Sequence, residues 1–182
     1  MQILSSPFYG VSGDYISIET VTVGSGGQAT VTFSSIPATY KHLQVRCISR
    51  DTSATNGIGA MKLTINSDTS STYTRHILYG DGASAASAYN STTGFSYTGI
   101  LVQGGSSASI FAANAIDILD YANTNKYKTV RSLSGADRNG SGEIDLISNL
   151  WQSTSAITTL SFAPISGNFA QYSQFALYGI KG

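Results

Sequence analysis

The sequence predicts an all-β protein, and three observations lead to this prediction. Apolar residues alternate with Ser and Thr over many short stretches, which is the period of a strand with one buried face. Glycines are frequent, with 19 in 182 residues, and they separate the alternating stretches as turn residues do. Charged residues make up only 11% of the chain, whereas the exposed face of a helix is usually rich in Glu, Lys and Arg.

The alternating pattern begins at Tyr15 and predicts a first strand that ends near Val23. The glycine-rich turn 24–27 follows, so the next stretch, 29–33, is expected to pair with the first strand as a β-hairpin. The best candidate for a helix, 110–119, fits a period of two better than the helical period of about 3.6. The remaining strands are predicted at 42–47, 61–65, 73–79, 95–103, 109–119, 127–134, 143–151, 157–162 and 175–180.

About ten short strands at this spacing predict an antiparallel β-sandwich of jelly-roll type. No shift in composition divides the chain, so residues 15–182 are expected to form one domain, preceded by an arm of residues 1–14. The stretches 83–87 and 104–107 are small and polar, and they are expected to be loops. The core is expected to contain apolar residues from several strands: Leu43, Val45, Met61, Leu63, Ile65, Ile116, Ile118, Leu146 and Phe175.

The overall charge and the single cysteine exclude several kinds of partner and linkage. Ten basic and ten acidic residues give a formal net charge of zero, so nothing draws the chain toward nucleic acid or an anionic membrane. One cysteine allows no intrachain disulfide. The first residues lack the pattern of a signal peptide, and no segment approaches the ~18 apolar residues of a membrane helix. We expect no nucleic-acid partner, no membrane partner and no cofactor.

Groups suited to catalysis are scarce in this sequence. His42 and His76 both lie on predicted strands, where we expect structural or surface roles for them. Cys47 alternates with Leu43 and Val45, which indicates a buried thiol rather than a nucleophile. No serine lies in a G-x-S-x-G turn, and the glycine-rich stretches lack the spacing of phosphate-binding loops. The sequence therefore predicts no catalytic residue and no enzyme activity.

Two acidic motifs have both a chemical and a structural interpretation. Asp117 and Asp120 could form an acid–base pair, but their place at a strand end before an Asn-rich turn favours turn hydrogen bonds. The segment 137–142 supplies oxygens at the first, third and fifth positions and glycine at the sixth, as calcium loops do. Ser148 stands where such a loop needs glutamate, and an Asn-Gly step favours a hairpin turn. We predict a hairpin, with a weak calcium site as the alternative, and we assign no metal ligand.

Aromatic residues suggest a further alternative. Eleven tyrosines and Trp151 could form a surface on which sugar rings stack. Tyrosine is also a favourable strand residue with a polar end, and Trp151 ends an apolar strand. We therefore expect Trp151 to lie in the core or in an interface.

Three segments resemble a known family. Segment 36–46, IPATYKHLQVR, is similar to one that is common in small structural proteins of tailed bacteriophages. Segment 117–131, DILDYANTNKYKTVR, and segment 175–181, FALYGIK, are similar to other segments of those proteins. The resemblance extends over about residues 15–182 and implies a virion protein without catalytic residues.

Within this resemblance, we expect a non-enzymatic structural component of a phage virion. A short chain with a β-domain and an apolar arm fits a capsid decoration (cement) protein that binds the head surface and stabilises it. Its partners would be the major capsid protein or other virion proteins. The alternative is a tail fibre or receptor-binding component that contacts carbohydrate on the host cell surface.

The arm 1–14 carries apolar side chains without a strand pattern, and such side chains need a surface to bury against. We expect the arm to reach a neighbouring subunit or the capsid, and the protein to form a homo-oligomer, a trimer. The trimer rests on the resemblance, because capsids offer local three-fold positions. The alternative is that the arm folds back over one end of its own sandwich. The assembly residues in this prediction are Ile3, Leu4, Phe8 and Tyr9.

Overall fold

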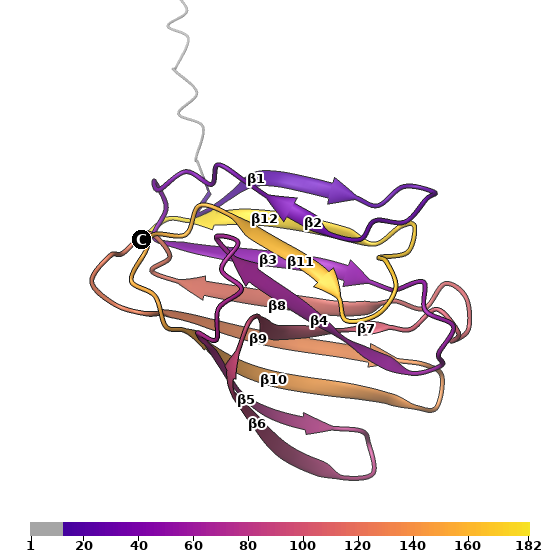
Figure 1. The fold of residues 1–182 in the computed structure, drawn as a ribbon. Helices are drawn as coiled ribbons and strands as arrows, with labels where there is room; N and C mark the ends of the chain where they lie inside the picture. Colours follow the sequence, from indigo (N-terminus) through magenta and orange to yellow (C-terminus); the bar gives the residue numbers. More distant parts are fainter. Residues whose placement is uncertain (1–12) are drawn as a thin grey trace, which may run out of the picture.

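A computed structural model describes residues 13–182, which form twelve strands in two antiparallel sheets (Figure 1). The smaller sheet has the order β2 (Val31–Phe33), β11 (Leu160–Pro164), β4 (Ile58–Ile65) and β7 (Ser96–Val102). The larger sheet has the order β1 (Tyr15–Thr22), β12 (Gln174–Ile180), β3 (His42–Ser49), β8 (Ala112–Leu119), β9 (Lys128–Asp137), β10 (Gly142–Trp151), β5 (Tyr73–Gly80) and β6 (Ala85–Thr93).

Eight of these strands, namely β1 to β4, β7, β8, β11 and β12, form a jelly roll. When they are renumbered one to eight along the chain, the sheets have the orders 1-8-3-6 and 2-7-4-5, as two Greek keys require. The predicted jelly-roll-like β-sandwich is therefore confirmed. The other four strands come from two hairpins and continue the larger sheet past β8. We call these four adjacent strands, β9–β10–β5–β6, the extension; Figure 1 shows β5 and β6 curving away below the smaller sheet.

The main core lies between the smaller sheet and the jelly-roll part of the larger one. At its centre, the Phe162 ring lies 6.4 Å from Phe33 and 5.7 Å from Phe175, measured between ring centroids. Fully burying one such side chain stabilises the fold by about 1.5–3 kcal/mol. Eight of the residues predicted from the sequence belong to this core: Leu43, Val45, Met61, Leu63, Ile65, Ile116, Ile118 and Phe175.

The prediction is wrong for the ninth residue, Leu146, which lies on β10 and is 51% exposed. Alternation shows which residues of a strand share a face, but it does not show which face is buried. On β10, Ile144 and Leu146 point outward, whereas Asp145 and Asn149 are buried. The strand therefore exposes two apolar side chains, and on its buried face it places two polar side chains beside the apolar Ile147 and Trp151.

Two further sequence predictions are corrected by the pairing of the strands. The first strand does not form a hairpin with 29–33, because β1 pairs with β12 and β2 pairs with β11 in the other sheet. The glycine-rich turn 24–27 thus crosses from one sheet to the other. The segment 83–87, predicted to be a loop, belongs partly to β6, which pairs with β5 at the edge of the extension.

Candidate functional site

The outer face of the larger sheet exposes large apolar side chains in a continuous group. Ladder pairing joins Leu133, Leu146 and Leu78 in one row across β9, β10 and β5. On the same face, Ile144 and Ile48 share the adjacent row on one side of these leucines, and Tyr89 lies in the adjacent row on the other side. Each of these side chains is between 46% and 71% exposed. We call the group the outer band: Ile48, Leu78, Tyr89, Leu133, Ile144 and Leu146.

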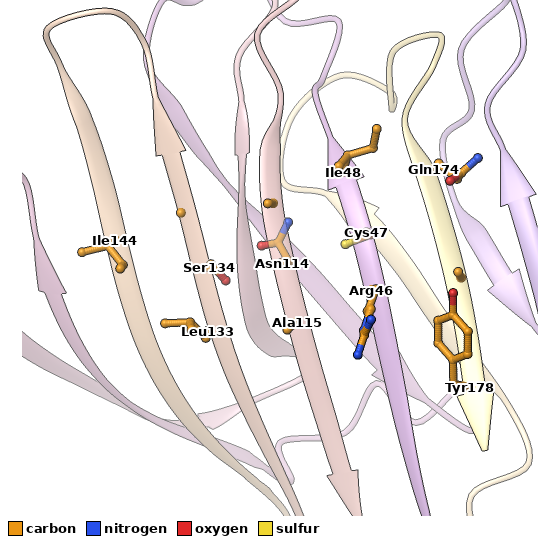
Figure 2. A pocket seen from close by; sticks show the side chains of 13 residues that line it. Arg46, Cys47, Ile48, Asn114, Ala115, Leu133, Ser134, Ile144, Gln174 and Tyr178 are labelled. Atoms are coloured by element: carbon orange, nitrogen blue, oxygen red, sulfur yellow. The ribbon is translucent and has the colours of Figure 1, made fainter. Parts of the chain in front are cut away.

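An open hollow of about 580 Å³ lies beside the outer band, over β12, β3, β8, β9 and β10 (Figure 2). Its floor consists of small residues on neighbouring strands, including Ala113, Ala115 and Ala176. Larger side chains, such as Ile48 and Ile144, stand at its sides. The difference in side-chain size, rather than a gap in the sheet, therefore creates the hollow.

A chain of polar contacts borders the hollow and orders its charged groups. The Arg46 Nε donates a hydrogen bond to Gln44 Oε1 at 2.7 Å, and Gln44 Nε2 donates to Asp117 Oδ1 at 2.7 Å. Arg131 forms an ion pair with Asp117 at 3.1 Å on the next strand. The Arg46 guanidinium also lies 5.7 Å from the centre of the Tyr178 ring. Asp117 is paired with Arg131, whereas Arg46 contacts the neutral Gln44 and Tyr178, so these contacts leave about one net positive charge beside the apolar area.

The opposite, inner face of the extension contains a second feature. A cleft of about 390 Å³ opens between the inner faces of β10 and β5 and the strands β4 and β7. Glu143 and Asp145, two residues apart on β10, both line it, and Arg75 of β5 lines it as well. The acidic pair predicted from the sequence is a different one, Asp117 and Asp120. The signal that could have found Glu143 and Asp145 is the i, i+2 spacing, which places two strand residues on one face.

Burial dominates the electrostatics of this cleft. Asp145 is only 2% exposed, and burial raises its pKa to about 7, with a further contribution from the charge of Glu143 and from a hydrogen bond between the two carboxyl groups. Arg75 opposes this rise through its positive charge. Burial in turn lowers the pKa of the Arg75 guanidinium. At neutral pH, the Asp145 carboxyl group is therefore partly protonated.

The acidic pair predicted from the sequence does not come together. Asp117 lies on β8 and binds Gln44 and Arg131, whereas Asp120 lies in the following turn and binds other partners. Hydrogen bonds from Lys126 and from Lys41 lower the pKa of Asp120 to about 2. The two acids share no partner in these contacts, so the structure gives no support to acid–base work between them. Asp120 does lie in the turn, but its carboxylate binds two lysine side chains instead of making the predicted turn hydrogen bonds, and Asp117 is a strand residue.

The segment 137–142 forms the predicted hairpin between β9 and β10. Asn139 and Gly140 have φ angles of 62° and 100°, and a type I′ turn requires positive φ at both central residues. The Arg138 N–H donates to the Ser141 carbonyl at 2.6 Å next to this turn. The Asp137 carboxylate accepts a hydrogen bond from the Asn139 N–H, as in an Asx turn. Across residues 13–182, no three His, Cys, Asp or Glu side chains group in a way that could hold a metal ion.

The remaining residues considered in the sequence are hydrogen-bonded, stacked on a ring or buried in the structure. His42 Nδ1 accepts a hydrogen bond from the Asp120 N–H at 2.9 Å, and exposed His76 stacks on Tyr89. Cys47 is buried, and this burial raises the pKa of its thiol to about 12, as the interpretation of a buried thiol requires. Trp151 is a core residue, as predicted.

Comparisons with known proteins give no family for this chain, since no protein-family model, curated protein or solved structure matches it. Within residues 13–182, the structure contains no helix that is long and apolar enough to cross a membrane. The assembly residues Ile3, Leu4, Phe8 and Tyr9 lie outside the described residues, so the arm stays a prediction.

Proposed function

We propose that the chain is a non-enzymatic structural protein that binds other copies of itself through the outer band and serves in a phage virion as a capsid decoration protein. The observation that carries this proposal is the outer band. Monomeric proteins seldom expose a continuous apolar surface without using it for an interaction. Here, the apolar side chains of β9, β10 and β5 form such a surface on one sheet face.

The size of the band agrees with an association surface. Its six side chains are each about half exposed, so covering them contributes roughly 5–9 kcal/mol, taken as half of the value for full burial. Bringing two molecules together costs an estimated 4–15 kcal/mol or more. The band alone therefore supports weak association, and a stable oligomer needs additional contacts. The apolar arm predicted from the sequence is one source of such contacts.

A second copy of this chain is the partner that fits the charge of this face. Asp117 and Arg131 are already paired, and Arg46 is held between Tyr15 and Tyr178. Of these groups only Arg46 lacks an acidic partner, so each of two identical faces brings about one positive charge to a contact that is otherwise apolar or paired. The outer band also runs to β6, an edge strand whose residues carry no charge and include no proline. Charged residues and prolines are the usual protection of such an edge against pairing.

The virion setting rests on the resemblance noted in the sequence, and the fold adds one supporting observation. The similar segments 36–46, 117–131 and 175–181 lead into or form parts of β3, β8, β9 and β12. These four strands are adjacent in the larger sheet, and they carry the hollow beside the outer band. The segments that carry the resemblance thus lie on adjacent strands, and they contribute Arg46, Ala176 and Tyr178 to the lining of the hollow.

Light scattering coupled to size exclusion tests self-association directly. The intact chain should elute at a multiple of 19.1 kDa, and at three times this mass if it is a trimer. The double variant Leu133→Glu/Leu146→Glu places charges in the middle of the outer band and should elute as a monomer. The matched control is Ile165→Glu, because Ile165 is 47% exposed but follows β11 in the other sheet. An intact chain that stays monomeric at high concentration, or a double variant with unchanged mass, would contradict the proposal.

The virion setting needs a separate measurement. A reconstruction of particles that contain this chain should show it distributed over the head surface. Density restricted to the tail would instead favour the alternative of a fibre or receptor-binding component.

A further inference from the structure

The cleft on the inner face of the extension combines polar groups of both signs with apolar walls. Arg75, Glu143 and Asp145 line one part of it. Its apolar walls come from both sheets, with Ile77 and Ile147 on one side and Ile100 on the other. The volume of about 390 Å³ falls in the lower part of the ~300–1,000 Å³ range of small-molecule sites. This feature lies on the face opposite the outer band, so it is independent of the proposed self-association.

Two polar atoms in the cleft have no hydrogen-bond partner among the described residues. One is Oδ1 of Asp145, whose side chain is almost completely buried. The other is Nε of Arg75, although the same guanidinium donates a hydrogen bond to Asn90 Oδ1 at 2.7 Å and lies 4.5 Å from the centre of the Tyr97 ring. The ion pairs within residues 13–182 do not join Arg75 to Asp145, so these groups do not satisfy each other. The wall of the cleft therefore contains a buried acceptor and a buried donor that are both unsatisfied.

The charge of the cleft distinguishes among ligand classes. Arg75 supplies a positive charge to the cleft, and Glu143 and Asp145 supply carboxyl groups. Burial raises the pKa of Asp145 to about 7, so this carboxyl group is partly protonated at neutral pH, which lowers the negative charge beside Arg75. An anionic ligand would be repelled by the carboxylate, and a cationic ligand would be repelled by Arg75. A neutral ligand with both donors and acceptors meets neither penalty.

We propose that the cleft between β7 and the inner face of β10 and β5 binds a neutral saccharide unit, with hydroxyl groups hydrogen-bonded to Asp145, Glu143 and Arg75. A sugar hydroxyl donates and accepts hydrogen bonds, so adjacent hydroxyls match a carboxylate and a guanidinium together. The C–H faces of a sugar ring pack against aliphatic side chains such as Ile77, Ile100 and Ile147. Saccharide binding requires no bond to be made or broken, and it adds a ligand to a protein whose proposed role is structural.

A titration monitored by TROSY nuclear magnetic resonance tests this assignment with defined probes. These are methyl β-D-glucopyranoside, methyl β-D-galactopyranoside and methyl N-acetyl-β-D-glucosaminide. At least one of them should shift amide signals of β5, β7 and β10 in a saturable manner. Glucosamine and glucuronate, which carry a charge, should bind at least about threefold more weakly than the best neutral probe.

Two cleft variants and one control connect the binding to named groups. Asp145→Asn keeps the shape of the side chain but places an amide in the cleft, and we expect binding to weaken about tenfold or more. Glu143→Gln should weaken it as well, and it serves if Asp145→Asn does not fold. Asp117→Asn is the matched control, because it removes a carboxylate from the outer face and should leave binding unchanged.

Three results would overturn the assignment. They are the absence of saturable shifts with all three neutral sugars, shifts confined to the hollow on the outer face, and undiminished binding in a folded Asp145→Asn or Glu143→Gln variant. The mass of the Asp145→Asn oligomer should equal that of the intact chain. Failure of saccharide binding is thus distinguishable from failure of self-association, since the two are measured on opposite faces of the sheet.

Discussion

Replacing Asp145 by asparagine should make the protein more stable at alkaline pH, although it removes a charged group from the interior. Asp145 is 2% exposed, and burial raises its pKa from 3.8 to about 7. In the unfolded chain, the carboxyl group ionises near its ordinary pKa of about 3.9. Between these two values, the folded protein holds a proton that the unfolded chain releases. The free energy of unfolding therefore falls as the pH rises from about 4 to about 7, and it levels off above.

The difference in pKa sets an upper bound on the effect. At about 1.4 kcal/mol for each pH unit, a rise from 3.8 to about 7 corresponds to at most about 4 kcal/mol. Roughly two thirds of this change falls between pH 5 and pH 8. Effective dielectric constants near 20 reduce such contributions even at buried sites, so we expect the intact chain to lose about 1–2 kcal/mol over this interval. Asparagine has no proton to lose, and the variant should show a flat profile.

Urea unfolding at pH 5 and pH 8 measures this difference, at one protein concentration because the chain is proposed to self-associate. The single tryptophan, Trp151, is buried against Tyr73 and reports on the core. Asp68 and Asp120 have pKa values of about 2 and stay ionised throughout this interval. Asp117→Asn on the outer face should leave the dependence on pH as it is. The reasoning is refuted if the intact chain is more stable at pH 8 than at pH 5, or if Asp145→Asn keeps the slope of the intact chain.

Three further predictions concern single residues. Cys47 should resist iodoacetamide at pH 8 in the folded protein and react after unfolding, because burial raises the pKa of its thiol to about 12. Gly140→Ala should lower the unfolding free energy by about 1–2 kcal/mol in urea titrations, since φ is +100° there and no atom lies within 4 Å of an added Cβ. Trp151→Phe should cost at least about 2 kcal/mol by circular dichroism, because it removes the 2.7 Å hydrogen bond from Nε1 to the Asp68 carboxylate.

The jelly-roll part of the fold was predictable because its strands follow a simple pattern. On β3, Leu43, Val45 and Cys47 alternate with residues that face outward, and the same alternation holds on β4 and β8. In these strands most buried side chains are apolar, with Ser49 on β3 and Asn114 on β8 as buried polar exceptions and Ile48 on β3 as an exposed apolar one. The hairpin between β9 and β10 was also predictable, because an Asn-Gly step favours positive φ at both central residues.

Sheet membership was not predictable from local pattern alone. The turn 24–27 has the glycines of a hairpin, but the strands on either side pair with β12 and β11, more than 120 residues further along the chain. Pairing over such a separation depends on which apolar faces meet in the core, and a turn of four residues does not encode this choice. The strand β6 was missed for a related reason. Ala and Ser residues at its start have weak strand preference, so its pairing with β5 decides its conformation.

The outer band and the inner cleft both involve β10, a strand on which the alternation of apolar residues did not predict the buried side chains correctly. On β10, the core rule placed Leu146 inside, yet Leu146 and Ile144 face solvent while Asp145 and Asn149 are buried. A strand of the larger sheet that extends past the smaller sheet could show this exchange if the smaller sheet covered it poorly. Asp145 and Asn149 are nevertheless each 2% exposed, and Ile147 and Trp151 are buried on the same face, so this face of β10 is well covered.

Shifting the register of β10 by one residue would place Ile144 and Leu146 inside and would move Asp145 and Asn149 out, but it would also expose Ile147 and Trp151, which are buried on the same face. The hairpin turn beside it fixes the register, because Asn139 and Gly140 determine which residue of β9 faces which residue of β10. Apolar side chains held outside and a carboxyl pair held inside are therefore the two features of the extension that call for partners, and they lie on its opposite faces.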